Sequence, residues 1–111
     1  MEISKTEFKH CDLLKVKGRI DSATAPQLSE ALNAITDGGR FRIAIDMSET
    51  TFISSAGLRV LISTQKTCKR YNRGELVLAM IPANIHEALE LAGFTSLFKI
   101  FDDVLQAVGN F

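Results

Sequence analysis

Two short segments that are apolar without interruption place the strongest constraint on the fold of this chain. Phe41–Asp46 and Glu75–Ile81 contain the runs Ile-Ala-Ile and Leu-Val-Leu-Ala-Met-Ile, and a strand has this composition when both faces of its sheet are covered. Between them, Ala56–Arg73 repeats apolar residues at helical spacing and is closed by Asn72 and Gly74. One helix between two buried strands predicts a right-handed βαβ crossover.

The remaining segments predict further strands and helices around this centre. Asp12–Ile20 alternates apolar and polar side chains, which is typical of a strand with one face in water. Ile3–Phe8 is a candidate neighbour that pairs with it through the turn around Lys9–Asp12. The other predicted elements are a helix that begins within Asp21–Pro26 and ends at Gly38-Gly39, a helix over Pro82–Ala92, a short strand near Phe98–Phe101, and a last helix that follows Asp102-Asp103 and buries Val104, Leu105 and Val108.

These elements define an α/β fold, with one domain over residues 1–111, a mixed four- to five-stranded sheet and about four helices packed mainly on one face. A chain of 111 residues removes roughly two thirds of its unfolded surface from water, which is enough for one core. Its 13 basic and 13 acidic residues cancel, so no global charge draws it to nucleic acid or anionic lipid. A monomer and a weak dimer are both compatible with this composition.

Cofactor, metal and membrane signals are weak in this sequence. Cys11 and Cys68 are far apart and lack CxxC or paired Cys/His spacing, and His10 and His86 are single, so neither a zinc site nor a disulfide is expected. No Gly-rich phosphate-binding motif occurs. The N-terminus lacks a basic region followed by an apolar stretch, and no run approaches the roughly 18 apolar residues of a membrane span. We expect a cytoplasmic protein with no cofactor, metal or membrane span.

Two loops at the ends of predicted strands are the candidate sites. Open α/β sheets place their sites at the carboxyl ends of strands, where loops lead into helices. The first loop is Asp21–Thr24. The second is Ser48–Leu58, which carries five hydroxyl side chains in eight positions and ends in two adjacent serines before the long helix.

Ser54 and Ser55 have a structural and a functional interpretation. The structural one is a helix N-cap, which contributes about 1 kcal/mol and occurs on very many helices. The functional one is a hydroxyl that is open to a modifying enzyme, because a helix N-terminus favours an added phosphate. Ala56 and Gly57 are small and leave the approach open. Both interpretations can hold for this pair of serines.

A serine nucleophile and a basic stripe are the two other candidate features. The segment Ile53–Gly57 matches half of the G-x-S-x-G hydrolase motif, but Ile53 breaks it and only Glu75 and His86 follow as partners. No catalytic residue is therefore expected. Basic residues on one face of the long helix have a structural interpretation, because cations near the carboxyl end of a helix stabilise it and a charged face is solvated. Their functional interpretation is contact with an acidic protein surface or a lipid headgroup. This stripe consists of Lys66, Lys69, Arg70 and Arg73.

The motifs of this chain resemble the STAS domain of bacterial anti-sigma factor antagonists. The resemblance covers essentially the whole chain, and it combines spacing, element order and size. The matching segments are Gly18–Asp21 with Thr24–Pro26, Asp46–Ser48, Phe52–Leu61 and Gly93–Phe101.

The resemblance implies a partner-switching regulator that is not an enzyme. In that family the unmodified protein binds a serine kinase that is also an anti-sigma factor, and so releases a sigma factor or another target. The kinase phosphorylates a serine before the Gly-Leu pair, and a PP2C-type phosphatase restores it. By position the acceptor is Ser55. Many members carry Asp just before the acceptor where this chain has Ser54, so Ser54 is the alternative acceptor.

The partner-binding residues predicted around this acceptor come from both loops. They are Asp21, Thr24, Ser54, Gly57 and Leu58. Phosphorylation adds about −1.5 to −2 charges, and a helix N-terminus tolerates them, so we expect the switch to block a surface and to leave the domain folded. The alternative function is a STAS-like regulatory subunit of a transporter or a lipid-transport ATPase.

Overall fold

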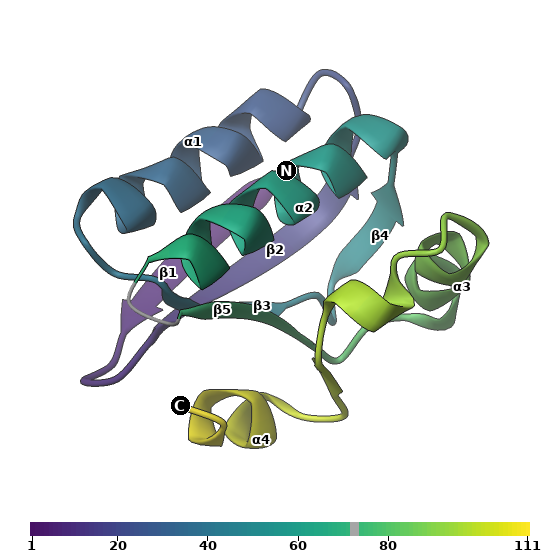
Figure 1. The fold of residues 1–111 in the computed structure, drawn as a ribbon. Helices are drawn as coiled ribbons and strands as arrows, with labels where there is room; N and C mark the ends of the chain where they lie inside the picture. Colours follow the sequence, from purple (N-terminus) through teal and green to yellow (C-terminus); the bar gives the residue numbers. More distant parts are fainter. Residues whose placement is uncertain (72–73) are drawn as a thin grey trace.

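A mixed six-stranded sheet forms the centre of the protein in this computed structural model, which describes residues 1–71 and 74–111 (Figure 1). The sheet order is β1-β2-β3-β5-β6; β1 is antiparallel to β2, the pairs from β2 to β6 are parallel, and β4 pairs with β2. The predicted parallel centre is therefore confirmed. The strands are β1 (Glu2–Glu7), β2 (Asp12–Ile20), β3 (Arg42–Asp46), β4 (Thr50–Ile53), β5 (Glu75–Ala79) and β6 (Ile100–Phe101).

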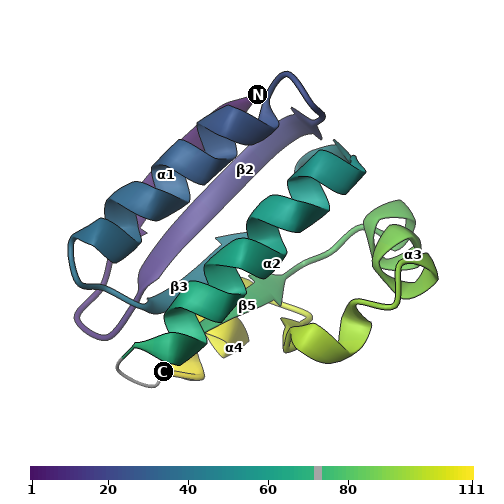
Figure 2. The same ribbon diagram turned by 45° about the horizontal axis from the view of Figure 1, so that its top comes forward.

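Two long helices cover one face of this sheet. The helices are α1 (Ala25–Asp37), α2 (Ser55–Arg70), α3 (Ala83–Leu91) and α4 (Val104–Gly109), with a short 3-10 helix η1 (Thr95–Leu97). Helices α1 and α2 lie side by side above the sheet, and α4 lies on the opposite face (Figures 1 and 2). The main core lies between the sheet and α1, α2 and α3. Its largest fully buried side chains are Leu14, Ile20, Leu28, Leu32, Ile43, Ile45, Met47, Leu61, Leu76, Leu78, Ile85 and Leu89.

Strand β4 (Thr50–Ile53) was not predicted from the sequence, because this segment was assigned to a loop. It continues the sheet where β3 ends, by pairing in parallel with the last residues of β2. The hydroxyl of Thr50 is buried and donates a 2.9 Å hydrogen bond to the carbonyl of Val16. Four residues that are rich in hydroxyls give no clear period, but Thr, Phe and Ile are good strand formers once a neighbour is present. The sheet accordingly has six strands instead of four or five.

Helix α2 (Ser55–Arg70) connects β3 and β5 as the βαβ prediction requires, with β4 inserted before it. The sequence predicted a helix over Ala56–Arg73, closed by Asn72 and Gly74, whereas α2 ends at Arg70. Asn72 and Arg73 lie outside the described part of the chain. Gly74 immediately precedes β5 and passes very close to Phe41. A Cβ on Gly74 would lie 2.1 Å from the carbonyl oxygen of Phe41, so the chain requires glycine here.

Helix α4 (Val104–Gly109) corrects one predicted core residue. Leu105 is 85% exposed, whereas Ala107 is fully buried against the second sheet face, beside Ala44 and Val77. The prediction placed Leu105 inside, but in a helix this short the inward face follows the i, i+3, i+4 spacing from Val104. The preceding residues predicted the helix start correctly, since Asp103 caps it by accepting a 2.7 Å hydrogen bond from the amide of Gln106.

None of the helices in the described part of the chain has the length and apolar character needed to cross a bilayer. Residues 1–71 and 74–111 hold no group of three or more metal-ligating side chains. Both cysteines are buried as free thiols, and burial raises the pKa of Cys68 to about 11. His86 lies 3.1 Å from Glu90, one turn further along α3.

Candidate functional site

The two predicted loops meet at one edge of the sheet. Strands β2 and β4 are parallel, and their last residues, Ile20 and Ile53, are paired in register. The amide of Ser54 donates a 2.8 Å hydrogen bond to the carbonyl of Ile20. The loop Asp21–Thr24 therefore lies beside the junction between β4 and α2, so that the starts of α1 and α2 are neighbours (Figure 2).

Ser54 is the N-cap of α2. Its backbone is extended, with φ −91° and ψ 172°, and its Oγ accepts a 3.3 Å hydrogen bond from the amide of Gly57. Its carbonyl accepts the first helical hydrogen bond, from the amide of Leu58 at 2.9 Å. One of the amides that a helix start leaves unpaired is thus satisfied by the serine side chain.

Replacing Ser54 with alanine is expected to lower the free energy of unfolding by about 1 kcal/mol, because the cap is lost. Ser55→Ala is the matched control, since the neighbouring hydroxyl is exposed and caps nothing among the described residues. Urea unfolding of the two variants measures the difference. Equal destabilisation by both substitutions would contradict the assignment of Ser54 as the cap.

Ser55 is the first residue of α2, and it is exposed. The first turn of the helix, Ser55–Leu58, contains no acidic residue, so no carboxylate of that turn occupies the positive end of the helix dipole. The Ser55 hydroxyl is consequently both reachable and placed where added negative charge is stabilised. These are the properties required of an acceptor for a phosphoryl group.

Gly57 and Leu58 lie on the inner side of α2. A Cβ on Gly57 would lie 2.6 Å from Cγ2 of Ile20 and 2.8 Å from Cγ1 of Ile53, so glycine lets the helix start pack directly on the two paired strands. Leu58 is also buried, within the main core. For both residues the structure gives a packing role. Their predicted part in partner binding stays a prediction.

Asp21 and Thr24 hold the neighbouring loop in one conformation. Oδ1 of Asp21 accepts hydrogen bonds from the amides of Ala23 and Thr24, both at 3.0 Å. The hydroxyl of Thr24 lies 2.8 Å from the carbonyl oxygen of Arg19 and accepts a hydrogen bond from the amide of Asp21 at 2.9 Å. Thr24 precedes α1 without capping it through its side chain. Both polar groups therefore shape the loop beside Ser54.

Asp21→Asn is expected to lower the free energy of unfolding at neutral pH. It should change this free energy little at a pH below the folded-state pKa of the Asp21 carboxyl. Hydrogen bonds, led by the one from the backbone of Thr24, hold the pKa of the Asp21 carboxyl below its ordinary 3.8. A carboxyl with a lowered folded-state pKa contributes stability above its unfolded pKa and loses it as pH falls through the folded value. The difference between the unfolding midpoints of the two proteins should therefore shrink as the pH is lowered below 3.8 and through the folded-state pKa. A constant difference would refute this role.

Arg19 and Phe52 belong to the same surface, and the sequence did not identify them. The two residues are paired across β2 and β4, and the guanidinium of Arg19 lies 4.4 Å from the centre of the Phe52 ring. Phe52 is 37% exposed. The guanidinium also lies 3.8 Å from the carboxylate of Asp21. This pair could be predicted from the sequence only if strand β4 and its pairing register with β2 were already known.

The basic stripe of α2 lies away from this edge, near the other end of the helix. Lys66, Lys69 and Arg70 are exposed, as predicted, and the guanidinium of Arg70 lies 5.7 Å from the centre of the Tyr71 ring. Arg73 lies outside the described residues. The stripe and the exposed serine therefore lie near opposite ends of α2.

A mixed sheet with α1 and α2 on one face and an exposed serine at the start of α2 defines an α/β domain of the STAS type. The model of the STAS domain family matches residues 2–107. The chain belongs to this family.

Relatives and solved structures agree with this assignment. BtrV of Bordetella bronchiseptica, named as a candidate anti-sigma factor antagonist, is 38% identical over 85 residues, which cover 77% of this chain and 72% of BtrV. The anti-sigma-B factor antagonist of Listeria monocytogenes is 30% identical over 100 residues, which cover 90% of this chain and 86% of the relative.

Two structures of one Bacillus protein share the fold. The anti-sigma factor antagonist SpoIIAA in its unphosphorylated form superposes with a TM-score of 0.75 at 12% identity and covers 98% of this chain and 96% of its own. The phosphorylated form of SpoIIAA also gives a TM-score of 0.75, at 13% identity, with 98% of both chains covered.

Proposed function

We propose that this protein is an anti-sigma factor antagonist. Its unphosphorylated form binds an anti-sigma factor that is also a serine kinase, and so releases the target of that factor in the cytoplasm. The observation that carries the proposal is the exposed hydroxyl of Ser55 at the start of α2, in a chain whose relatives at 30% identity or more are named for this role. Those names favour this function over the transporter-subunit alternative.

The protein is the substrate of the switch and not its enzyme. The Ser55 oxygen attacks the terminal phosphorus of ATP bound to the kinase, the bond from that phosphorus to the bridging oxygen breaks, ADP leaves, and the hydroxyl proton passes to a base of the kinase. A PP2C-type phosphatase reverses the change by hydrolysing the phosphoserine to serine and inorganic phosphate. Ser54 remains the alternative acceptor.

The partner contacts the edge of the sheet around Ser55. Asp21 and Thr24 give this surface its fixed loop, and Arg19 and Phe52 add a cation and an exposed aromatic ring. Aromatic and arginine side chains carry much of the energy in protein interfaces. Gly57 and Leu58 contribute indirectly, because they are not themselves exposed and they pack the start of α2 against β2 and β4.

Phosphorylation blocks this surface without unfolding the domain. The phosphate is added at the positive end of a 16-residue helix, where a negative charge is stabilised. The equal TM-scores of this chain with the unphosphorylated and phosphorylated forms of SpoIIAA support a fold that accommodates both states.

The test is phosphorylation by the cognate kinase with ATP, read by intact mass and peptide mapping. The wild-type protein and Ser54→Ala should each gain one phosphoryl group, whereas Ser55→Ala should gain none and should still bind the unreacted kinase. Phosphorylation of Ser55→Ala on Ser54 would move the acceptor by one residue. If neither serine were modified and no anti-sigma factor bound, the proposed function would be wrong.

A further inference from the structure

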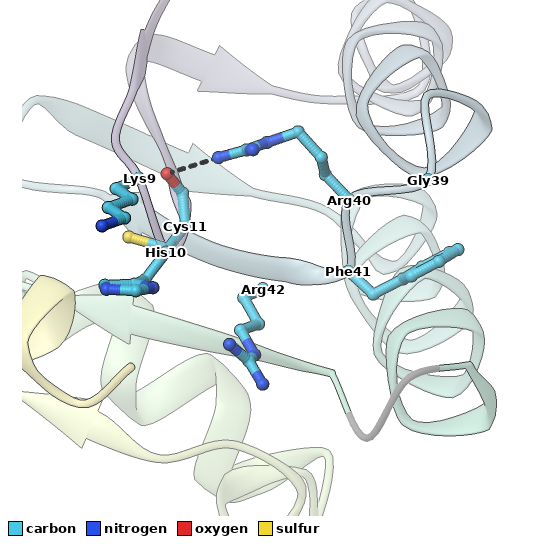
Figure 3. A pocket seen from close by; sticks show the side chains of 7 residues that line it. All are labelled: Lys9, His10, Cys11, Gly39, Arg40, Phe41 and Arg42. Carbon is cyan, nitrogen blue, oxygen red and sulfur yellow. Dashed lines mark hydrogen bonds between the residues drawn. The ribbon is translucent and has the colours of Figure 1, made fainter.

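The end of the sheet opposite Ser55 holds a pocket that the proposed function does not use. The turn between β1 and β2 and the connection between α1 and β3 enclose a cavity of about 440 Å³, which is open to solvent (Figure 3). Four of the seven described residues that line it are basic residue types, and none is acidic. The lining consists of Lys9, His10, Cys11, Gly39, Arg40, Phe41 and Arg42.

Arg40 forms a fixed wall of the pocket. Its Nε donates a 2.7 Å hydrogen bond to Oδ2 of the fully buried Asp12, and its Nη2 donates to the carbonyls of Phe8 at 2.5 Å and Cys11 at 3.2 Å. These bonds leave Nη1 without a partner among the described residues, and the side chain is 34% exposed. The guanidinium is therefore held in one orientation with donors still available, as recognition of an oxyanion requires.

The other basic side chains have no competing carboxylate in the pocket. Lys9, His10 and Arg42 form no ion pair within residues 1–71 and 74–111. Arg42 is paired with Glu75 across β3 and β5, but the carboxylate of Glu75 lies 3.5 Å from the amine of Lys99. Arg42 extends to the side on which His10 lies, and Phe41 points away (Figure 3).

Glu7 and Asp12 are the acids closest in sequence to the turn, and neither lines the pocket. The carboxylate of Asp12 forms an ion pair with Arg40. Its Oδ1 is buried without a hydrogen-bond partner among the described residues. Glu7 lies at the end of β1 and contributes to the raised pKa of Arg40, after the larger effect of the hydrogen bond that Arg40 donates to Asp12. The open side of the cavity is consequently basic in a protein whose formal net charge is zero.

We propose that this pocket binds a phosphate-bearing anion, either a small soluble molecule or the headgroup of a lipid. Guanidinium and ammonium groups are the side chains that bind phosphate oxygens most strongly, and a cavity of this volume has the size of a small-ligand site. The site is separate from Ser55, so anion binding and phosphorylation occupy opposite ends of the sheet.

The experiment is a titration of the whole protein with inorganic pyrophosphate, followed by amide NMR at constant ionic strength. Saturable shifts are expected in Lys9–Cys11 and Gly39–Arg42. Arg42→Gln and Lys9→Gln should each weaken binding by about tenfold or more, because each removes a charge-assisted hydrogen bond. Arg40 is left intact, since it also neutralises Asp12. Lys69→Gln, which removes an exposed cation outside the pocket, is the control and should bind normally.

The outcomes separate the sources of the phosphate and test the site. Co-sedimentation with phosphatidylcholine vesicles that contain phosphatidic acid, weakened by Arg42→Gln, identifies a lipid headgroup. Pyrophosphate binding without vesicle binding identifies a soluble ligand. Shifts spread over all exposed lysines and unchanged by Arg42→Gln, or no binding to either probe, would overturn the proposal. Phosphorylation of Ser55 in Arg42→Gln should equal that of the wild type, so the two proposals fail independently.

Discussion

Gly74→Ala is expected to destabilise the folded protein by about 3 kcal/mol, because there is no room for a methyl group. A Cβ at this position would lie 2.1 Å from the carbonyl oxygen, 2.4 Å from the Cβ and 2.7 Å from the carbonyl carbon of Phe41. The carbonyl atoms are backbone, and the amide of Glu75 donates a 2.8 Å hydrogen bond to that same oxygen. The clash between the added methyl group and Phe41 could be removed only if the starts of β3 and β5 moved apart.

Chemical unfolding of Gly74→Ala and of Gly109→Ala provides the measurement and its control. Gly109 ends α4, and no atom of the described residues outside its own helix turn lies within 4 Å of the position of its Cβ. Its substitution should change the free energy of unfolding by less than about 0.5 kcal/mol. A Gly74→Ala protein as stable as Gly109→Ala would show that β3 and β5 do not approach each other as closely as described.

Ser55→Asp is expected to weaken binding of the anti-sigma factor by about a hundredfold, because an unpaired charge would be desolvated in the interface. The matched control is Ser55→Asn, which has the same shape without the charge and should bind much more tightly than Ser55→Asp. Ser63→Asp adds the same charge at another exposed position of α2 and should bind normally. Titration calorimetry with the purified anti-sigma factor measures all three variants.

The same variants distinguish a blocked surface from a damaged fold. Ser55→Asp should keep the far-UV circular dichroism and the thermal midpoint of the wild type, because its charge lies at a helix N-terminus. If Ser55→Asp and Ser55→Asn bound the anti-sigma factor equally well, the added charge could not be the basis of the switch. A large loss of stability in Ser55→Asp would instead attribute the weaker binding to unfolding.

The centre of the fold was predictable because its strands are covered on both sides. Burial on two faces leaves an apolar run with no alternation, and this pattern placed β3 and β5 within a few residues of their observed bounds. The bounds of β2 were predicted without error, since one wet face imposes strict alternation. The cap at Ser54 was predictable for a similar reason, because the interaction is local in sequence.

The missed features depend on contacts between distant segments. Strand β4 exists because the end of β2 offers it hydrogen bonds, and the pairing of Arg19 with Phe52 follows from that register. The reasons for glycine at 57 and 74 are close approaches to Ile20, Ile53 and Phe41, which no local pattern reveals. The pocket at Arg40 likewise combines two segments about 30 positions apart in sequence.

The pairing of β4 with β2 has a consequence for the energetics of recognition. A peptide segment that is disordered before association loses conformational freedom when it binds, and this loss subtracts from affinity. Here the residues that precede Ser55 are already ordered by the sheet, through the amide of Ser54 and the buried hydroxyl of Thr50. In the proposed complex, association would therefore carry little ordering entropy, and one added charge could decide whether the complex forms.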